Sequence, residues 1–371
     1  MVGDNLNVHK ILLKKQNKKI DGKIFFSVLF LTVVGLIAVA DASAPQALND
    51  FNDKYYFLKQ QAVWWVLGIG VMLVVSQIKY TLWEKLSLPF LIVGFLALIA
   101  VLIPGVGTKV LGARRWIFIG SASIQPSELI KISLLIYLAA LSSANKGILA
   151  YLLPVGLAAG LIMLEPDLGT TIILTAMSLV QIFASGIKLK DVILSLVAGL
   201  GAGLFFSITS EYRRDRLLTF FKFSQDPLGR DYHIRQVLLG LGSGGLFGVG
   251  LGQSHQKYLF LPEASTDSIF AVIAEEIGFL GSFIIVGVFA FLILRGFKIA
   301  NSAPDQFSRV LAVGITAWIG VQTLLNIGAM TALVPLTGIP LPFISYGGSA
   351  LVTILFATGI LLNISKYANE K

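Results

Sequence analysis

The stretch LPEASTDSIFAVIAEEIGFLGSFIIVGVFAFLIL, residues 261–294, contains the transition on which the fold depends. A polar segment ends at Asp267, and the apolar run that begins at Ser268 exceeds the about 20 residues that cross a bilayer as a helix. The carboxylate of Asp267 is therefore expected at the boundary between water and hydrocarbon. An ionisable group at that boundary is often functional, and it can act on a substrate anchored in the membrane.

The composition of the whole chain is typical of a membrane protein. Its 371 residues are 56% hydrophobic and only 13% charged, and the mean hydropathy is +0.82. Soluble domains carry about 25% charged residues, so this chain lacks the polar surface of a soluble protein. It contains no cysteine, which excludes disulfides, thiolate metal sites and cysteine nucleophiles.

The apolar runs predict the number of membrane spans. Backbone groups in lipid must bond within their own segment, so each run is expected to form a helix. The sequence predicts an all-α membrane protein, a polytopic bundle of about ten transmembrane helices with a large extracytoplasmic loop between helices 7 and 8. The predicted spans are residues 24–40, 60–77, 86–104, 127–142, 148–164, 168–186, 190–209, 268–294, 307–331 and 342–365.

Lysine and arginine residues in short loops predict the orientation, because such residues remain mainly on the cytoplasmic side. They gather before the first span, in alternate turns and after the last span. This pattern predicts a cytoplasmic basic N-tail (1–23), a membrane domain (24–365) and a cytoplasmic C-tail (366–371), with loop 210–267 outside. The topology accounts for the net charge of +9, so nucleic-acid binding is not expected.

Charged residues gather at the predicted outer end of the fourth span. Glu128 and Lys131 are three residues apart and can pair on one helix face, and Ser127 is a candidate N-cap. Ahead of them, Arg114 and Arg115 carry guanidinium groups whose geometry suits phosphate. Two interpretations stay open at this point: a self-neutralising pair with ordinary interface anchors, or cations that meet an anionic substrate such as a pyrophosphate.

Carboxylates also lie near two other predicted helix starts. The helix dipole favours Asp167 at its helix start, which is sufficient to explain that residue. Thr266 or Ser265 is expected to cap the eighth helix, with Asp267 in its first turn. Glu275 lies about 12 Å further along this helix, where a carboxylate needs a partner. The residues alone leave both a catalytic and a stabilising role open for Asp267.

Two other kinds of site are not expected. His9, His233 and His255 are too scattered to predict a metal site. Residues 240–245 match the pattern GxGxxG, but no strand–helix–strand unit surrounds them, so a dinucleotide site is not predicted. The glycines of this region are instead expected to form a closely packed hairpin beside the site.

Several motifs together resemble the SEDS family of bacteria, named for shape, elongation, division and sporulation. The resemblance covers all the predicted spans and is closer to the division members than to the elongation members. One departure is Ser265, where many members have His before the Thr-Asp pair. The motifs are GARRW (112–116), QPSEL (125–129), DPLG (226–229), LPEASTD (261–267), AVIAEEIG (271–278) and PLPFISYGGS (340–349).

The resemblance implies a peptidoglycan glycosyltransferase at the outer face of the bacterial cytoplasmic membrane. It would polymerise lipid II together with a class B penicillin-binding protein of a division or elongation complex. The family's essential Asp falls on Asp267, the expected general base for a sugar hydroxyl. No cofactor is expected, with a divalent ion (Mg²⁺ or Mn²⁺) as the open alternative. Other residues expected to bind the substrate are Arg114, Arg115, Glu128, Lys131, Glu263, Glu275, Ser345 and Tyr346.

Two functions without glycosyl transfer are the alternatives. A lipid II flippase needs polar groups through the full depth of the bilayer, whereas the cytoplasmic halves of the predicted spans carry almost none. This contrast favours the enzyme. A non-catalytic scaffold that recruits a transpeptidase would leave Asp267 without a function.

Overall fold

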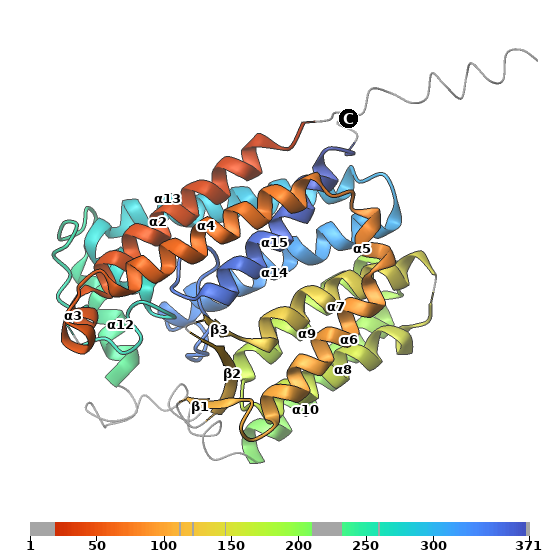
Figure 1. Ribbon diagram of the computed structural model, residues 1–371, viewed down its shortest axis with the longest axis horizontal. Coiled ribbons are helices and arrows are strands. Elements are labelled where there is room, and N and C mark those ends of the chain that lie inside the picture. The colour runs from red at the N-terminus through yellow and green to blue at the C-terminus, as the bar shows by residue number, and fades with distance from the viewer. Residues whose placement is uncertain are drawn as a thin grey trace, which may run out of the picture.

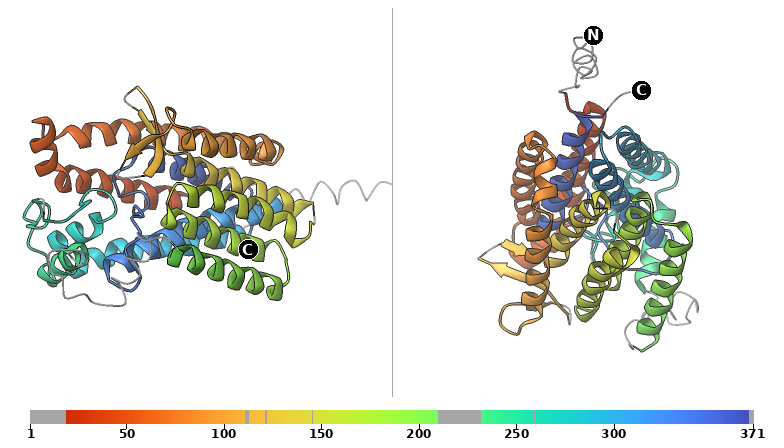
Figure 2. Two further views of the ribbon diagram at one scale, coloured as in Figure 1. Left: turned by 90° about the horizontal axis from the view of Figure 1, so that it is seen from below. Right: turned by 90° about the vertical axis from the view of Figure 1, so that its right-hand side faces the viewer.

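The computed structural model describes residues 19–110, 113–120, 122–144, 146–209, 232–258 and 260–368. The chain is mostly helical, and its long helices lie side by side along one axis (Figures 1 and 2). The helices are α2 Gly22–Ala42, α3 Ala44–Phe51, α4 Tyr56–Gln77, α5 Thr81–Lys85, α6 Ser87–Leu102, α7 Pro126–Ser143, α8 Ile148–Leu164, α9 Leu168–Ala184, α10 Leu189–Thr209, α12 Tyr232–Ser243, α13 Ile269–Asn301, α14 Gln306–Met330 and α15 Gly348–Ser365.

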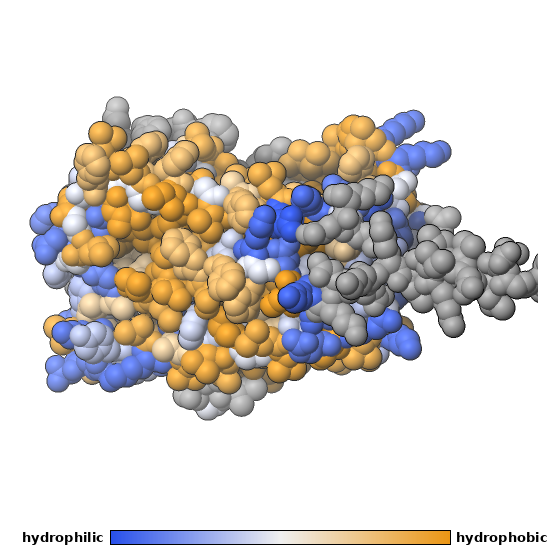
Figure 3. Space-filling view, turned by 90° about the horizontal axis from the view of Figure 1, so that it is seen from above, coloured by the Kyte–Doolittle hydropathy of each residue, from blue (hydrophilic) through white to orange (hydrophobic). Residues whose placement is uncertain are grey.

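The apolar character of these helices agrees with the helical membrane protein predicted from the sequence. Each predicted span falls on a helix, and among the described residues six helices are long and apolar enough to cross a membrane: α2, α4, α7, α13, α14 and α15. The helices α6, α8 and α9 are apolar but shorter. A broad hydrophobic surface occupies the middle of the molecule, with hydrophilic surface toward both ends (Figure 3).

Helix α14 is the central helix of the bundle. In the most apolar 18-residue window of α14, 78% of the residues are buried, compared with 28% in the corresponding window of α13 and 22% in that of α4. It contacts α7, α9, α13 and α15. Because most of α14 is shielded from lipid and water, its buried polar side chains must bond to protein. Two of them, Gln322 and Asn326, do so near the site described below.

A small antiparallel sheet was not predicted from the sequence. Its strands are β1 Thr108–Val110, β2 Ala113–Ile119 and β3 Ala122–Ile124, in the order β1-β2-β3. They connect α6 to α7, at the same end of the bundle as the start of α7 (Figure 1). Strands this short carry too little alternation to be recognised beside long apolar runs. The sheet determines where Arg114 and Arg115 lie.

Helix α13 is interrupted at Gly278, whose φ of 67° and ψ of −171° are not helical. Residues 269–276 before the break are all buried, whereas Phe279 and Phe283 just after it are 61% and 64% exposed. The lipid-facing part of the helix therefore begins after Gly278. Glu275 lies in the part packed inside protein, where it has the hydrogen-bond partners that the sequence required.

The glycine-rich turn after α12 packs closely against this break, in agreement with the close packing that the sequence predicted for these glycines. The amide nitrogens of Val249 and Gly250 donate to the carbonyls of Glu275 and Glu276, which lost their helical partners at the break. A Cβ on Gly248 would lie 2.0 Å from the Glu276 carbonyl oxygen. Only glycine permits this close approach, and its φ of +84° also favours glycine.

Candidate active site

Asp267 lies at the end of the bundle where α13 begins, hereafter the Asp267 end. Its side chain is 8% exposed. The Asn326 amide of α14 donates to the Asp267 carbonyl over 2.7 Å and, over the same distance, to the carbonyl of Ile339. From Gln306 to Asn326, α14 rises about 30 Å, the thickness of a hydrocarbon core. Asp267 is thus one bilayer thickness from the opposite end of α14.

The segment between α14 and α15 holds the chain immediately before Asp267. The Ser345 hydroxyl donates to the Thr266 carbonyl and accepts from the Leu341 amide at 2.8 Å. The Tyr346 amide donates to the Ser265 carbonyl at 2.9 Å. Ser345 and Tyr346, expected from the resemblance to bind substrate, therefore lie at the site and fix the backbone that carries Asp267.

The start of α13 differs from the predicted cap. The N-cap is Ser268, which forms no side-chain cap bond, and Asp267 precedes it rather than lying in the first turn. The reason is a tight turn, in which the amides of Thr266 and Ser268 both donate to the Glu263 carbonyl. The exposed Glu263 has a φ of 51° and accepts the Thr266 hydroxyl at 2.8 Å. The Ser268 hydroxyl bonds His233 of α12 at 2.7 Å.

Lys131 and Glu128 form the predicted pair, with 2.8 Å between Nζ and Oε1. Both side chains are buried at the start of α7, and Lys131 lies 4.7 Å from the ring centroid of Trp318. Lys131 also donates to Gln322 at 3.4 Å, and Gln322 donates to the carbonyl of Pro340 at 2.9 Å. The pair is thereby joined to the segment that holds Asp267.

The predicted cap of this helix is wrong. Its N-cap is Gln125, with Pro126 at the first helical position. Ser127 therefore lies inside the first turn and is buried there. The proline satisfies this helix start in another way, because its fixed φ suits the position and it has no N–H to leave unpaired.

Arg115 binds a tight turn between α8 and α9. Its guanidinium donates to the carbonyls of Glu165 and Pro166 and lies 3.9 Å from the Asp167 carboxylate. Asp167 caps α9 by accepting from the Thr170 amide at 2.9 Å, which confirms its predicted helix-start role. Arg115 is therefore occupied by protein. Arg114 is half-buried on β2.

Glu165, in the same turn, is a buried carboxyl with an altered acidity. Its side chain is 0% exposed, and neither carboxyl oxygen has a hydrogen-bond partner within the described chain. Burial, reinforced by the negative charge of Asp167 and opposed by Arg115, raises the pKa of Glu165 to about 8. The group is therefore mostly neutral at pH 7.

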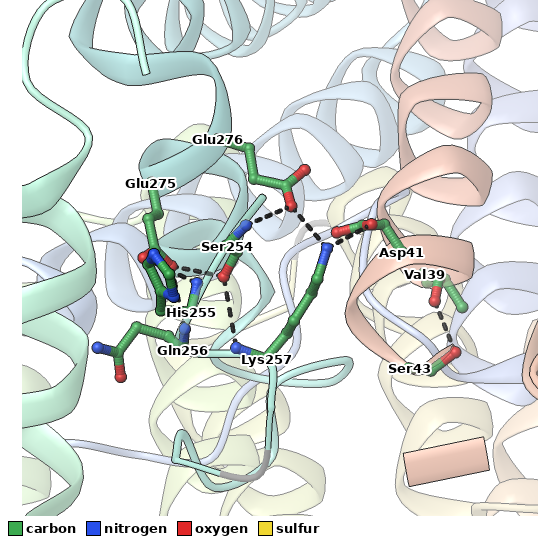
Figure 4. A network of polar contacts seen from close by, with 9 residues as sticks. All are labelled: Val39, Asp41, Ser43, Ser254, His255, Gln256, Lys257, Glu275 and Glu276. Carbon is green, nitrogen blue, oxygen red and sulfur yellow. Dashed lines mark hydrogen bonds and ion pairs between the residues drawn. The ribbon is translucent and has the colours of Figure 1, made fainter. Parts of the chain in front are cut away.

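Glu275 and Glu276 of α13 belong to a polar network with the segment 254–257 (Figure 4). Glu275 accepts from the Ser254 hydroxyl and from the His255 amide at 3.1 Å. Glu276 accepts from the Ser254 amide at 3.1 Å and pairs with Lys257 at 3.0 Å. These bonds supply the partners that the sequence required, and they hold the segment before the Asp267 turn.

Lys257 joins this network to α2. Its ammonium is 2.7 Å from Asp41 and 3.0 Å from Glu276, and the side chain is buried. Burial alone would lower the pKa of Lys257, but the bonds to the two carboxylates outweigh it and raise the pKa. The charge of Lys257 is thus retained in the folded protein.

The structure brings together one group of predicted residues and separates others. Glu128, Lys131, Ser345, Tyr346 and Glu263 connect to the Asp267 segment through the contacts above, whereas Arg115 and Glu275 bond elsewhere. Within the described ranges, no group of three His, Asp or Glu side chains could hold a metal ion. Residues 210–231 of the predicted outer loop, with the DPLG motif (226–229), lie outside the described part of the chain.

Sequence reasoning missed four residues that support the site. They are His233, Lys257, Gln322 and Asn326. For Gln322 and Asn326 a signal existed, because polar side chains inside an apolar run at a buried helix require partners. No such signal marked the other two, which lie in polar loops or at a helix start.

The fold and site define a class: a polytopic helical membrane protein that fixes a buried carboxylate at one end of its central helix. The profile of the cell cycle protein family, which includes FtsW, RodA and SpoVE, matches residues 22–370. The chain therefore belongs to this family, the SEDS family that the motifs indicated.

Relatives from two branches of the family are similarly close. Stage V sporulation protein E of Bacillus subtilis (strain 168) is 40% identical over 92% of this chain and 95% of its own. The probable peptidoglycan glycosyltransferase FtsW of Trichlorobacter lovleyi is 40% identical over 91% of each chain. The predicted similarity to division members is confirmed, and the sporulation relative is equally similar.

Solved structures share the fold over nearly the whole chain. A chain from a peptidoglycan synthase complex that coordinates polymerization and crosslinking matches with a TM-score of 0.77 and 26% identity, covering 94% of this chain and 99% of its own. The rod shape determining protein RodA of Thermus thermophilus matches with a TM-score of 0.70 and 26% identity, covering 95% of this chain and 98% of its own.

Proposed function

We propose that this protein is a peptidoglycan glycosyltransferase that polymerises lipid II, with Asp267 as the general base. Relatives named as probable peptidoglycan glycosyltransferases cover over nine-tenths of the chain. The observation that supports this role for Asp267 is its location in the bundle. Its carboxylate is almost buried, and neighbouring elements fix its backbone one bilayer thickness from the other end of α14.

The chemistry needs one base and a stabilised leaving group. The Asp267 carboxylate takes the proton of the sugar 4-hydroxyl, whose oxygen attacks the anomeric carbon of the donor. The bond from that carbon to the polyprenyl pyrophosphate breaks, and the pyrophosphate leaves with the electron pair. An α-linked donor then gives a β-linked glycan in one inversion, without a covalent enzyme intermediate.

Arg114 is the residue proposed to meet the leaving pyrophosphate. In the sheet it is paired in register with Lys109. Like charges at facing positions repel unless an anion lies between them, so this hairpin presents a positive site suited to phosphate. A Mg²⁺ or Mn²⁺ ion carried by the pyrophosphate would supply similar charge, and polymerisation in the presence of a chelator tests that alternative.

Lys131 and Glu128 are proposed to position the site rather than to bind substrate directly. Both are buried and neutralise each other. Their connection runs through Gln322 to Pro340, next to Ile339, which shares the Asn326 amide with Asp267. A change at Lys131 is therefore expected to act on catalysis through the segment between α14 and α15.

The proposed setting is the bacterial cytoplasmic membrane, with ten spans and the Asp267 end outside. The ten helices that coincide with predicted spans and the basic residues of the alternate turns support this topology, with both termini in the cytoplasm. The proposed partner is a class B penicillin-binding protein, supported by the related complex that couples polymerization to crosslinking.

Reconstituted vesicles test the function against lipid transport. Purified protein is supplied with fluorescent lipid II, and both the glycan length on a gel and the lipid II reaching the other leaflet are measured. We expect long glycan strands that a muramidase degrades. Protein-dependent crossing of lipid II without glycan strands would instead establish a transporter.

A further inference from the structure

A pocket of about 600 Å³ lies at the end of the bundle opposite Asp267. It is formed where α2 begins and where α13 and α15 end, so three helices far apart in the sequence contribute to it (Figure 1). Its size is within the range of about 300–1,000 Å³ for ligand sites. It shares no residue with the site at the Asp267 end, so the proposed reaction does not account for it.

The lining of the pocket carries an excess of positive charge. Asp21 accepts from the Lys23 and Ile24 amides at the start of α2 and pairs with Arg295 at 2.6 Å. This carboxylate is therefore already neutralised. Lys19, Lys23 and Lys298 are exposed and, within the described ranges, form no ion pair.

The wall nearer the middle of the bundle is aromatic. Phe291 lies two turns before Lys298 on α13, or about 10 Å toward the middle of the bundle. Phe26 lies one turn beyond Lys23 on α2, and the two rings are 67% (Phe26) and 45% (Phe291) exposed. At this end, hydrophilic surface meets the hydrophobic belt (Figure 3). The lysines therefore lie at the outer edge of the pocket, and the apolar rings lie next to them toward the middle of the bundle.

We propose that this pocket binds an anionic phospholipid, with the headgroup phosphate on the lysines and the acyl chains along Phe26 and Phe291. Basic pockets between transmembrane helices on the cytoplasmic side suit such headgroups. A soluble anion would use the lysines but not the exposed aromatic rings. The assignment to the inner leaflet rests on the proposed orientation, whereas the binding itself does not.

Photocrosslinking in vesicles tests the site. The full-length protein is reconstituted in phosphatidylcholine vesicles containing phosphatidylglycerol with a photoreactive acyl chain, and the crosslinked peptides are identified. We expect crosslinks at the peptides containing Phe26 and Phe291, and few from phosphatidylcholine with the same reactive chain. Equal crosslinking by the two lipids would overturn the proposal.

Charge removal inside and outside the pocket provides the control. The triple variant Lys19→Gln, Lys23→Gln, Lys298→Gln should lower crosslinking at least about tenfold, because each basic group near an anionic surface contributes about fivefold. The matched variant Lys79→Gln, Lys85→Gln, Lys146→Gln removes the same charge elsewhere and should keep the crosslinking within about twofold of wild type. Equal losses in both variants would show general surface attraction and refute a site.

Competition identifies the source of the phosphate. Unlabelled phosphatidylglycerol should displace the probe, and inorganic phosphate should not. Displacement by inorganic phosphate, or preferential displacement by lipid II, would overturn the assignment to a bilayer phospholipid. Crosslinking needs no catalysis, so it can succeed even if the protein polymerises nothing. Conversely, glycan synthesis by the triple variant should persist, because its lysines lie away from Asp267.

Discussion

Replacing Asn326 with leucine tests whether Asp267 depends on its backbone being held. Leucine has a similar volume but no donor, so Asn326→Leu removes both 2.7 Å bonds, to the Asp267 and Ile339 carbonyls. Each buried acceptor left without a partner costs about 1–3 kcal/mol, or roughly 2–6 kcal/mol for the pair. A loss of this size is enough to release the Asp267 segment from its fixed position.

The expected result is a fall in kcat with little change in KM. A misplacement of about 1 Å costs about 100-fold in rate, so we expect kcat for lipid II polymerisation to fall about 10- to 100-fold. KM should change less, because substrate binding uses other groups. The assay is initial-rate glycan synthesis by purified protein that elutes as a single folded species.

A neighbouring residue provides the control for this variant. Thr323 is also buried on α14, but its hydroxyl bonds only the Ile319 carbonyl within its own helix. Thr323→Val should keep kcat within about twofold, because such in-helix bonds contribute little. A folded Asn326→Leu protein with normal kcat would refute the claim that this amide positions the base.

Three further variants test other parts of the structure. For Glu165→Gln, the thermal stability should exceed that of wild type by an amount that grows from pH 4.5 to about 8 and then levels off. The reason is that folded wild type keeps Glu165 protonated up to about pH 8, whereas the unfolded chain releases this proton above about pH 4.5, which lowers the stability of wild type by up to about 5 kcal/mol. A difference between the two proteins that is independent of pH would contradict the buried neutral carboxyl. Lys257→Met should lower stability by about 3–5 kcal/mol, since it removes the cation shared by two carboxylates, whereas Lys59→Met at the exposed pair with Asp53 should hardly change it; equal melting temperatures of the two variants would argue against the network in Figure 4. Ser345→Ala should reduce polymerisation about tenfold through loss of its bond to the Thr266 carbonyl, and unchanged glycan synthesis would show that this bond does not position the site.

The helical architecture could be predicted because hydrophobic length is a strong local signal. Every predicted span corresponds to a helix, and the Glu128–Lys131 pair and the Asp167 cap follow from spacing alone. Other features depend on residues distant in sequence. Asn326 meets Asp267 only because α14 packs against the start of α13, and a single sequence does not specify that packing.

The errors arose where tertiary contacts replaced a local rule. Thr266 does not cap α13, because its hydroxyl bonds Glu263 within the turn. Arg115 is bound to carbonyls of the turn between α8 and α9, because the unpredicted sheet carries it there. Each error concerns the surroundings of a residue, not its chemical type.

The direct test of the central claim is glycan synthesis by the Asp267→Asn variant. Asparagine preserves the shape of the side chain and the backbone bond from Asn326, but it cannot accept the proton of the sugar hydroxyl. We expect folded Asp267→Asn, assayed with lipid II and a penicillin-binding partner, to make no detectable glycan strands while wild type does. Strands formed by the variant at a rate near that of wild type would contradict a general base at Asp267.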